Sequence, residues 1–144
     1  MNHKAVGTKG QNCVIGELAK WNIDVAYPLS DNLPFDLVII RNNKLFRAQI
    51  KTSEKQKTKG SIRFNLRTTN WYSGTMKTYT KDDCDIFLCY DIPSNALYLL
   101  SPFDFSDRIN FTIRIEESKN KQKKMINHHK DFIITEKRLN NILN

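Results

Sequence analysis

The sequence lacks any apolar run that approaches the roughly 20 residues needed for a membrane-spanning helix. Its first residues, MNHKAVGTKG, also lack the apolar segment of a secretory signal. Its three cysteines, Cys13, Cys84 and Cys89, have no CxxC spacing, which argues against a disulfide framework or a zinc site and favours reduced, mostly buried thiols. These absences predict a cytoplasmic, single-domain protein over residues 1–144, with no membrane partner and no small-molecule cofactor.

Acidic residues are almost absent from the middle of the chain. Between Lys44 and Lys81 lie ten basic residues and one acid, Glu54, so this segment carries +9. The whole chain carries +8, so the remainder sums to −1. Charge concentrated in one segment is typical of proteins that bind nucleic acid. The alternative, a merely solvated face of a lysine-rich protein, is less favoured because the excess is local.

Periodicity predicts one mixed α/β domain in which strands outnumber helices. Val14, Leu18 and Trp21 follow helical spacing within residues 11–21, and the final stretch, ITEKRLNNILN, predicts a second helix. Residues 70–83 fit a loop or a short helix, and residues 118–131 fit a basic connector. Strands are predicted over residues 23–27, 35–41, 44–52, 61–67, 85–90, 96–100 and 111–115.

The stretch LPFDLVIIRNNKLFRAQIKTSEKQ predicts a hairpin with a definite register. Its central Asn42-Asn43 suits a type I′ turn, because asparagine tolerates the positive φ that both positions need. Facing residues then have numbers that sum to 85, which places Asp36 opposite Gln49. The other face becomes apolar, as a core face requires. Its pairs are Phe35–Ile50, Leu37–Ala48 and Ile39–Phe46.

Three polar side chains therefore share one face at one end of the hairpin. Asp36 offers a charged oxygen and Gln49 an amide oxygen, which are ligand types that Mg²⁺ accepts. Lys51 lies beside them, where it can orient or deprotonate a water, or stabilise charge on a phosphate. These are the groups needed for metal-assisted phosphodiester hydrolysis.

Glu17 lies at the edge of the apolar stripe of the first predicted helix. A carboxylate at that position needs a partner, because burial of an unpaired charge is costly. A contact to the metal, direct or through water, would provide one. An ion pair with a lysine or a contact to an N–H group would do so equally well.

The motif of these residues resembles that of the PD-(D/E)XK nuclease superfamily. PFD (34–36) and QIK (49–51) match its two motif halves across a hairpin, and KGQNCVIGELA (9–19) is similar to its first helix. The most similar group is that of small single-domain nucleases related to intron-encoded homing endonucleases, which carry glutamine in place of the second acid. YTKDDCDIFLCYD (79–91) and FTIRIEESKNKQ (111–122) extend the resemblance, which covers residues 9–123.

The resemblance implies a restriction-endonuclease-like α/β core, with a central mixed β-sheet flanked by helices in the order α-β-β-β-α-β. It implies that Asp36 is the principal metal ligand, that Gln49 takes the place of the second acid, and that Lys51 is the catalytic lysine. Glu17 matches the acid of the first helix. The cofactor implied is Mg²⁺, with Mn²⁺ as a substitute.

The basic segment that follows the motif predicts contacts to DNA. Asn65 lies between Arg63 and Arg67 on one face of a predicted strand, which suits a base-reading ribbon in the major groove. His128 and His129 are assigned no role. Candidate contacts to phosphates are Lys55, Lys57, Lys59, Arg63 and Arg67.

The function predicted is a Mg²⁺-dependent DNA endonuclease that makes site-specific double-strand cuts. Cleavage of double-stranded DNA needs two active sites, which predicts a homodimer or a dimer of dimers. Two alternatives stay open. One is a resolvase selective for Holliday-type junctions, and the other is a non-catalytic nucleic-acid-binding protein that keeps the nuclease fold.

Overall fold

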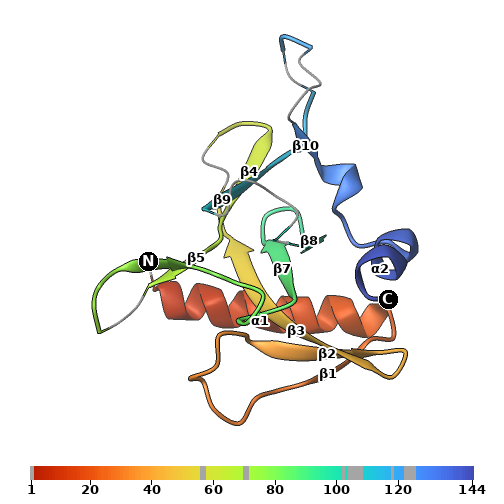
Figure 1. Cartoon of the computed structure of the whole chain (residues 1–144). Helices are drawn as coiled ribbons and strands as arrows, with labels where there is room; N and C mark the ends of the chain where they lie inside the picture. The colour runs from red at the N-terminus through yellow and green to blue at the C-terminus, as the bar shows by residue number, and fades with distance from the viewer. Residues whose placement is uncertain are drawn as a thin grey trace.

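A five-stranded mixed sheet forms the centre of the computed structural model, which describes residues 2–55, 58–69, 72–101, 103, 109–117, 119–121 and 126–144 (Figure 1). The strands lie in the order β1-β2-β3-β7-β8, and only the β3–β7 pair is parallel. Helix α1 precedes the sheet in the chain. The bounds are α1 His3–Lys20, β1 Asp24–Ala26, β2 Leu37–Arg41, β3 Lys44–Ser53, β7 Ile86–Asp91 and β8 Ala96–Leu100.

Smaller elements occupy the connection from β3 to β7 and the C-terminal part of the chain. A second sheet has the order β10-β9-β4, and β5 and β6 form a separate hairpin. The described residues between β3 and β7 therefore hold three strands where the resemblance implied a helix. The bounds are β4 Ser61–Asn65, β5 Arg67–Thr69, β6 Met76–Thr78, β9 Asn110–Arg114, β10 Asn127–His128, a 3₁₀ turn at His129–Asp131 and α2 Glu136–Ile142.

Alternation along β7 divides the core into two layers. Leu88 packs with Val14 of α1 and Leu139 of α2, whereas its neighbour Phe87 packs with Phe64 of β4 on the opposite face. Both helices thus cover one face of the central sheet, and the second sheet covers the other. Each large apolar side chain buried in these layers stabilises the fold by about 1.5–3 kcal/mol.

The α/β class predicted from the sequence, a mixed sheet with flanking helices, is confirmed. The first helix begins earlier than its apolar stripe predicted, at His3, because its first two turns are largely exposed and carry no apolar periodicity. Cys84 and Cys89 are buried free thiols, as predicted, and burial raises the pKa of Cys84 to about 12. No helix in the described ranges is long and apolar enough to cross a membrane.

Helix α1 lies close against β3 at Gly10. A Cβ added there would lie 2.7 Å from Thr52 Cγ2 and 2.9 Å from Thr52 Cβ. Gly10 therefore lets the helix lie directly against the strand and brings Gly7 and Gln11 beside the end of the hairpin.

Gly10→Ala is therefore expected to destabilise the protein. Overpacking costs about 1–3 kcal/mol, which exceeds the gain of about 1 kcal/mol in helix propensity. Gly16→Ala is the matched control on the same helix, because the added Cβ would meet no atom within 4 Å beyond its chain neighbours and the backbone of the helix itself, and it should stabilise the protein. Urea denaturation measures both changes, and equal stabilisation by the two substitutions would contradict the close approach.

Candidate active site

The hairpin of β2 and β3 has the register predicted from the sequence. Leu37 pairs with Ala48 and Ile39 with Phe46, and the ladder closes at the Arg41–Lys44 pair. Asn42 and Asn43 both have positive φ, 51° and 61°, as the type I′ turn requires. The local sequence therefore fixes the alignment of the two strands that carry the motif.

The ladder stops before it reaches Asp36. The N–H of Asp36 donates to the carbonyl oxygen of Ala48 (2.9 Å), and the N–H of Ile50 donates to Asp36 Oδ2 (2.8 Å). The side chain of Asp36 thus takes the place of a backbone acceptor at the end of the hairpin. The predicted Phe35–Ile50 pair on one apolar face is wrong, because Phe35 packs in the cluster on the opposite side of the sheet.

A hollow of about 260 Å³ forms at this point because β3 continues past the start of β2. From Gln49 to Ser53, β3 pairs with β7 on one edge, while no β2 residue pairs with its other edge. Helix α1 borders the same space. The hollow brings together the three residues of the predicted motif, and its lining is Gly7, Gln11, Asp36, Gln49, Ile50, Lys51 and Thr52.

Asp36 is half-buried in this hollow. Burial raises the pKa of its carboxyl group above the usual value, although the N–H of Ile50 and the charge of Lys51 act in the opposite direction. Oδ2 accepts the Ile50 N–H, and among the described residues no hydrogen bond to Oδ1 is found, so Oδ1 can take a further partner. A divalent cation would favour the ionised form of this carboxylate.

Lys51 is held by groups on the connection from β3 to β7. Its Nζ donates to the carbonyl oxygen of Arg67 (2.9 Å) and lies 3.5 Å from the hydroxyl of Tyr79, whose ring centroid is 4.8 Å away. Burial lowers the pKa of Lys51, while nearby Cys89 and Asp36 raise it. A lysine with a lowered pKa gives up its proton more readily than an exposed lysine does.

Two amides complete the polar lining of the hollow. Gln49 Nε2 donates to the carbonyl oxygen of Ile50 (3.3 Å), which leaves Gln49 Oε1 as the oxygen available to a cation. Gln11, which was not predicted from the sequence, lines the hollow from α1. The described residues contain no cluster of three His, Cys, Asp or Glu side chains. The hollow offers oxygen ligands that suit a hard cation, with Asp36 as their one carboxylate.

The structure does not bring Glu17 to this hollow. Glu17 forms an ion pair with Lys20 (2.8 Å), which was one of the alternatives left open by its position in the sequence. It lies six residues after Gln11, a rise of about 9 Å along a helix axis. The acid of the first helix and the lining of the hollow are therefore separate features.

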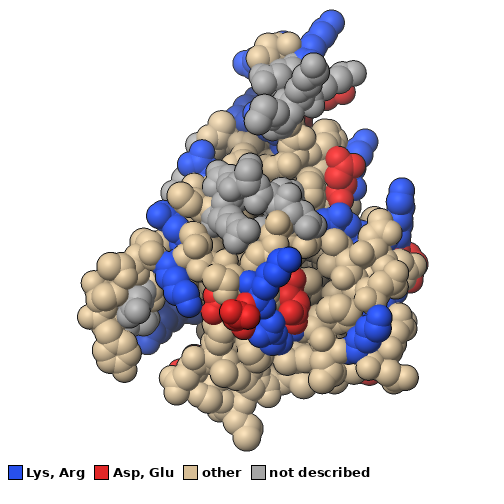
Figure 2. Space-filling model, viewed as in Figure 1, with Lys and Arg blue, Asp and Glu red and all other residues tan. Residues whose placement is uncertain are grey.

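The predicted DNA contacts differ in their exposure. Lys55, Lys59, Arg63 and Asn65 are exposed, and Lys57 lies outside the described residues. Lys and Arg side chains run down the left side of the face shown in Figure 2, from the level of β4 to that of β5. The predicted ribbon of Arg63, Asn65 and Arg67 is wrong in one respect, because β4 ends at Asn65 and Arg67 begins β5.

One arginine of the basic segment has a structural role. Arg47 binds Asp85 through its side chain, with Nη2 2.9 Å from Oδ1, and its backbone N–H donates to Asp85 Oδ2 (2.7 Å). It also donates to the carbonyl oxygens of Lys81 and Asp82. These contacts join β3 to the turn that precedes β7, so the net charge of the segment overstates what is available to DNA.

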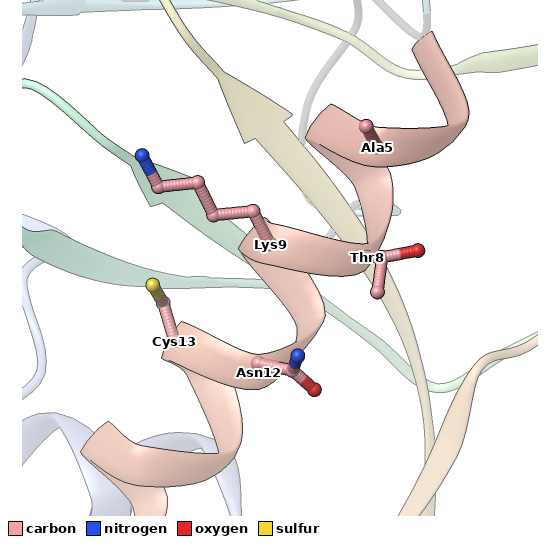
Figure 3. Close-up of a pocket in the computed structure, with 5 residues that line it drawn as sticks. All are labelled: Ala5, Thr8, Lys9, Asn12 and Cys13. Carbon is pink, nitrogen blue, oxygen red and sulfur yellow. The ribbon is translucent and has the colours of Figure 1, made fainter. Parts of the chain in front are cut away.

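A second hollow lies along α1, but its lining carries no comparable chemistry. The residues that line it all come from this one helix, and Lys9 and Cys13 project to one side while Thr8 and Asn12 project to the other (Figure 3). Apart from Cys13, these residues and Ala5 are exposed. The hollow at Asp36 is therefore the stronger candidate for an active site.

Comparisons with known proteins bear on the family and the fold of this chain. A family model described as PD-(D/E)XK endonuclease matches residues 1–135. Among solved structures, a bacterial homing endonuclease, I-Ssp6803I, is similar with a TM-score of 0.70 and 25% sequence identity. The match covers 86% of this chain and 84% of that chain. No match was found among curated proteins.

Proposed function

This chain belongs to the PD-(D/E)XK endonuclease family, and from that premise we propose that it is a metal-dependent endonuclease that cleaves double-stranded DNA at specific sites. One observation carries the proposal: Asp36, Gln49 and Lys51 line a single hollow at the open edge of β3. The likeness to a homing endonuclease supports site-specific cleavage. The excess of basic residues near this hollow supports DNA as the substrate.

The residues of the hollow divide the work of hydrolysis. Asp36 and the amide oxygens of Gln49 and Gln11 would hold the cation, which would be Mg²⁺ or, as a substitute, Mn²⁺. The chemistry that such an ion would supply here is Lewis acidity toward the phosphate and the attacking water. Lys51 takes a proton from the attacking water or stabilises charge on the phosphate. Glu17 is left out of this proposed site, because it is paired with Lys20 and does not line the hollow.

Two copies of the site are needed to cut both strands of a duplex. We therefore propose a homodimer or a dimer of dimers as the active form. The phosphate contacts come from the exposed lysines of the segment after β3, Lys55 and Lys59, with Arg63 and Arg67 nearby. These contacts give affinity and register without reading the sequence.

The test is cleavage by wild type and Asp36→Asn with Mg²⁺ or Mn²⁺. Each protein is incubated with a randomised duplex library and with a four-way junction, and new ends are sequenced. Cuts by wild type alone, at one recurrent sequence, are expected. Cuts confined to the four-way junction would contradict site-specific cleavage of duplex DNA. They would instead indicate a nuclease that resolves branched DNA.

A non-catalytic DNA-binding protein is the second candidate. The observation in its favour is that Asp36 is the one carboxylate in the lining of the hollow, beside two glutamines. Removal of negative charge weakens the attraction for a cation. Binding of the library by both proteins, with no new ends in any metal, would support this candidate.

The small negative charge of the hollow leads to a prediction about Gln11. Gln11→Glu is expected to raise the affinity for Mn²⁺ by about tenfold or more, because it adds a carboxylate beside Asp36, and tenfold corresponds to about 1.4 kcal/mol. Calorimetric titration of DNA-free protein with Mn²⁺ measures the change.

Glu17→Gln is the matched control on the same helix. It removes a carboxylate that is paired with Lys20, outside the lining of the hollow, so the Mn²⁺ affinity should be unchanged. Loss of affinity in Glu17→Gln, with no gain in Gln11→Glu, would instead identify Glu17 as the helix ligand.

A further inference from the structure

The second sheet presents a polar face on the side that points away from the core. In β4, Ile62 and Phe64 are buried, whereas Arg63 and Asn65 are exposed. The same alternation in β9 buries Phe111 and Ile113 and leaves its other residues half-exposed. Five of the residues on the outward side are named here the outer face: Arg63, Asn65, Thr112, Arg114 and His128.

We infer that this outer face lies in the major groove of duplex DNA and selects the target sequence. The inference rests on the proposed function, because it assumes that DNA is the substrate. It differs from the ribbon predicted from the sequence, since it uses three strands that are far apart in the chain and does not use Arg67. It also gives His128 a role that the sequence alone did not indicate.

The chemistry of the outer face suits direct reading of bases. Strands β4, β9 and β10 contain no Asp or Glu, so no carboxylate on these strands opposes the phosphates. Arg63 is exposed and carries a guanidinium group of the kind that binds guanine through two hydrogen bonds. Thr112 can contact a thymine methyl group or donate a hydrogen bond. The face is therefore both basic and able to discriminate between bases.

The geometry of the sheet suits the dimensions of the groove. Arg63 pairs directly with Thr112, and His128 pairs with Arg114. Directly paired side chains have Cβ atoms about 4.5–5.5 Å apart, and neighbouring strands are about 4.8 Å apart. A major groove about 12 Å wide admits a two-stranded ribbon, here β4 and β9, and the two residues of β10 lie beside it. Arg63 and Thr112 can thus reach adjacent base pairs at the same time.

Two hydrogen bonds join the outer face to the catalytic lysine. Asn65 Oδ1 accepts the N–H of Arg67 (3.0 Å), and the carbonyl oxygen of Arg67 accepts from Lys51 Nζ (2.9 Å). The end of β4 is therefore fixed relative to Lys51 through three residues. A duplex read by β4 would have its backbone close to the hollow, as cleavage near a recognised sequence requires.

Asn65 contributes to the reading of bases and to the position of Lys51 through different atoms. Its side-chain oxygen is used by the N–H of Arg67, and its NH₂ group is left as a donor toward a base acceptor. Because the same side chain fixes Arg67, Asn65 is a positioning residue for Lys51 as well as a member of the outer face. For this reason Arg63, which has no part in that link, is the better residue to test.

The test measures sequence preference by binding, so it does not depend on catalysis. Asp36→Asn protein, which should bind without cutting, is used to select duplexes from a randomised library, and the selected duplexes are sequenced. The same selection is made with two further proteins, in which Asp36→Asn is combined with Arg63→Ala or with Arg63→Lys. Arg63→Ala is expected to reduce the preference at one or two adjacent positions by about tenfold or more and to leave the other positions unchanged.

Arg63→Lys keeps the charge but loses the planar fork of donors, so it should retain most of the affinity and still lose that preference. Lys55→Ala is the matched control for a phosphate contact. It should weaken binding to all sequences alike and reduce the slope of log affinity against log salt by about 1.

Three outcomes would overturn the inference. The first is an Arg63→Ala variant that weakens binding to every sequence equally and keeps the wild-type preference, which would make the face a backbone contact. The second is a preference that Arg63→Ala leaves intact with no loss of affinity. The third is the absence of any binding to DNA by the parent protein, and only this result would also remove the proposed function.

Discussion

Asp36→Asn is expected to reduce DNA cleavage by about 10³-fold or more and at the same time to leave the protein as stable as wild type, or more stable, at pH 7. The loss of activity follows from the removal of the one carboxylate in the lining of the hollow. Charge stabilisation by a bound metal is worth several kcal/mol, and each 1.36 kcal/mol is a factor of ten in rate. Single-turnover cleavage with Mg²⁺ measures the loss.

The stability of the same variant follows from the environment of Asp36. Burial raises the pKa of this carboxyl group, so the ionised form is disfavoured in the folded protein. Asparagine removes that charge and keeps an oxygen to accept the N–H of Ile50. The substitution therefore removes an unfavourable contribution without leaving a buried donor unpaired.

The sign of the effect depends on pH. A group whose pKa is raised on folding contributes stability that is fully present below its unfolded value, near 3.8, and is lost as the pH rises through the folded value. In EDTA, the unfolding free energy of wild type minus that of Asp36→Asn should fall as the pH rises from about 3.8 to neutrality. Urea denaturation across this range measures the difference.

Two controls separate this effect from general damage. Mg²⁺ should raise the melting temperature of wild type and have a smaller effect on Asp36→Asn, because a ligand stabilises the state that binds it. Asp85→Asn should show the opposite dependence of stability on pH. The hydrogen bond from Arg47 lowers the pKa of Asp85, so the stability that Asp85 contributes is lost as the pH falls. An Asp36→Asn variant that is less stable than wild type at pH 7 would contradict the prediction.

The hairpin could be predicted from the sequence because its determinants are local. Two adjacent asparagines fix the turn, and an apolar face with a period of two residues fixes the register, which is confirmed from Leu37–Ala48 to Arg41–Lys44. The end of the hairpin could not be predicted in the same way. There the side chain of Asp36 replaces a ladder hydrogen bond, and no periodic pattern encodes such a replacement.

Gln11 was missed for a different reason. An amide on a helix has no charge that needs a partner, whereas the carboxylate of Glu17 has one, so the pattern of the helix indicates Glu17 and not Gln11. The signal that could have found Gln11 is Gly10, because a glycine within a helix often marks a close approach to a neighbouring strand. The approach of Gly10 to Thr52 sets the rotation of α1 that turns Gln11 toward Asp36.

The second sheet depends on contacts between distant parts of the chain. Strand β4 pairs with β9 across more than forty intervening residues, and β10 consists of Asn127 and His128 only. A strand of two residues has no periodicity to detect. The alternation of polar and apolar residues in β4 could be predicted from the sequence. The strands that pair with β4 and complete the outer face could not.

Lys51→Met is expected to reduce cleavage by about 10²- to 10⁴-fold, the range typical of the loss of a general acid or base. Methionine keeps most of the volume of the lysine side chain but removes the group that donates to Arg67 and lies beside Asp36. Lys51→Arg should not restore activity, because a guanidinium group stays protonated and is larger. Single-turnover cleavage at saturating protein separates this loss from weaker binding.

Lys55→Met is the matched control, since it removes the same charge from an exposed position. It should weaken binding, and its cleavage rate should recover when protein is saturating and salt is low. If Lys51→Met cleaves DNA as fast as Lys55→Met does under these conditions, a catalytic role for Lys51 is contradicted.

The pH dependence of cleavage distinguishes the two roles proposed for Lys51. If the neutral amine takes a proton from water, the wild-type rate should rise with pH through the pKa of Lys51, which burial lowers, and Lys51→Met should lose that rise. If Lys51 acts through its positive charge, the wild-type rate should fall over the same range.

In either case Asp36 and Lys51 act on one reacting phosphate, so the double variant Asp36→Asn/Lys51→Met should cleave no more slowly than the slower single variant. Losses that multiply in the double variant would show that the two residues act independently.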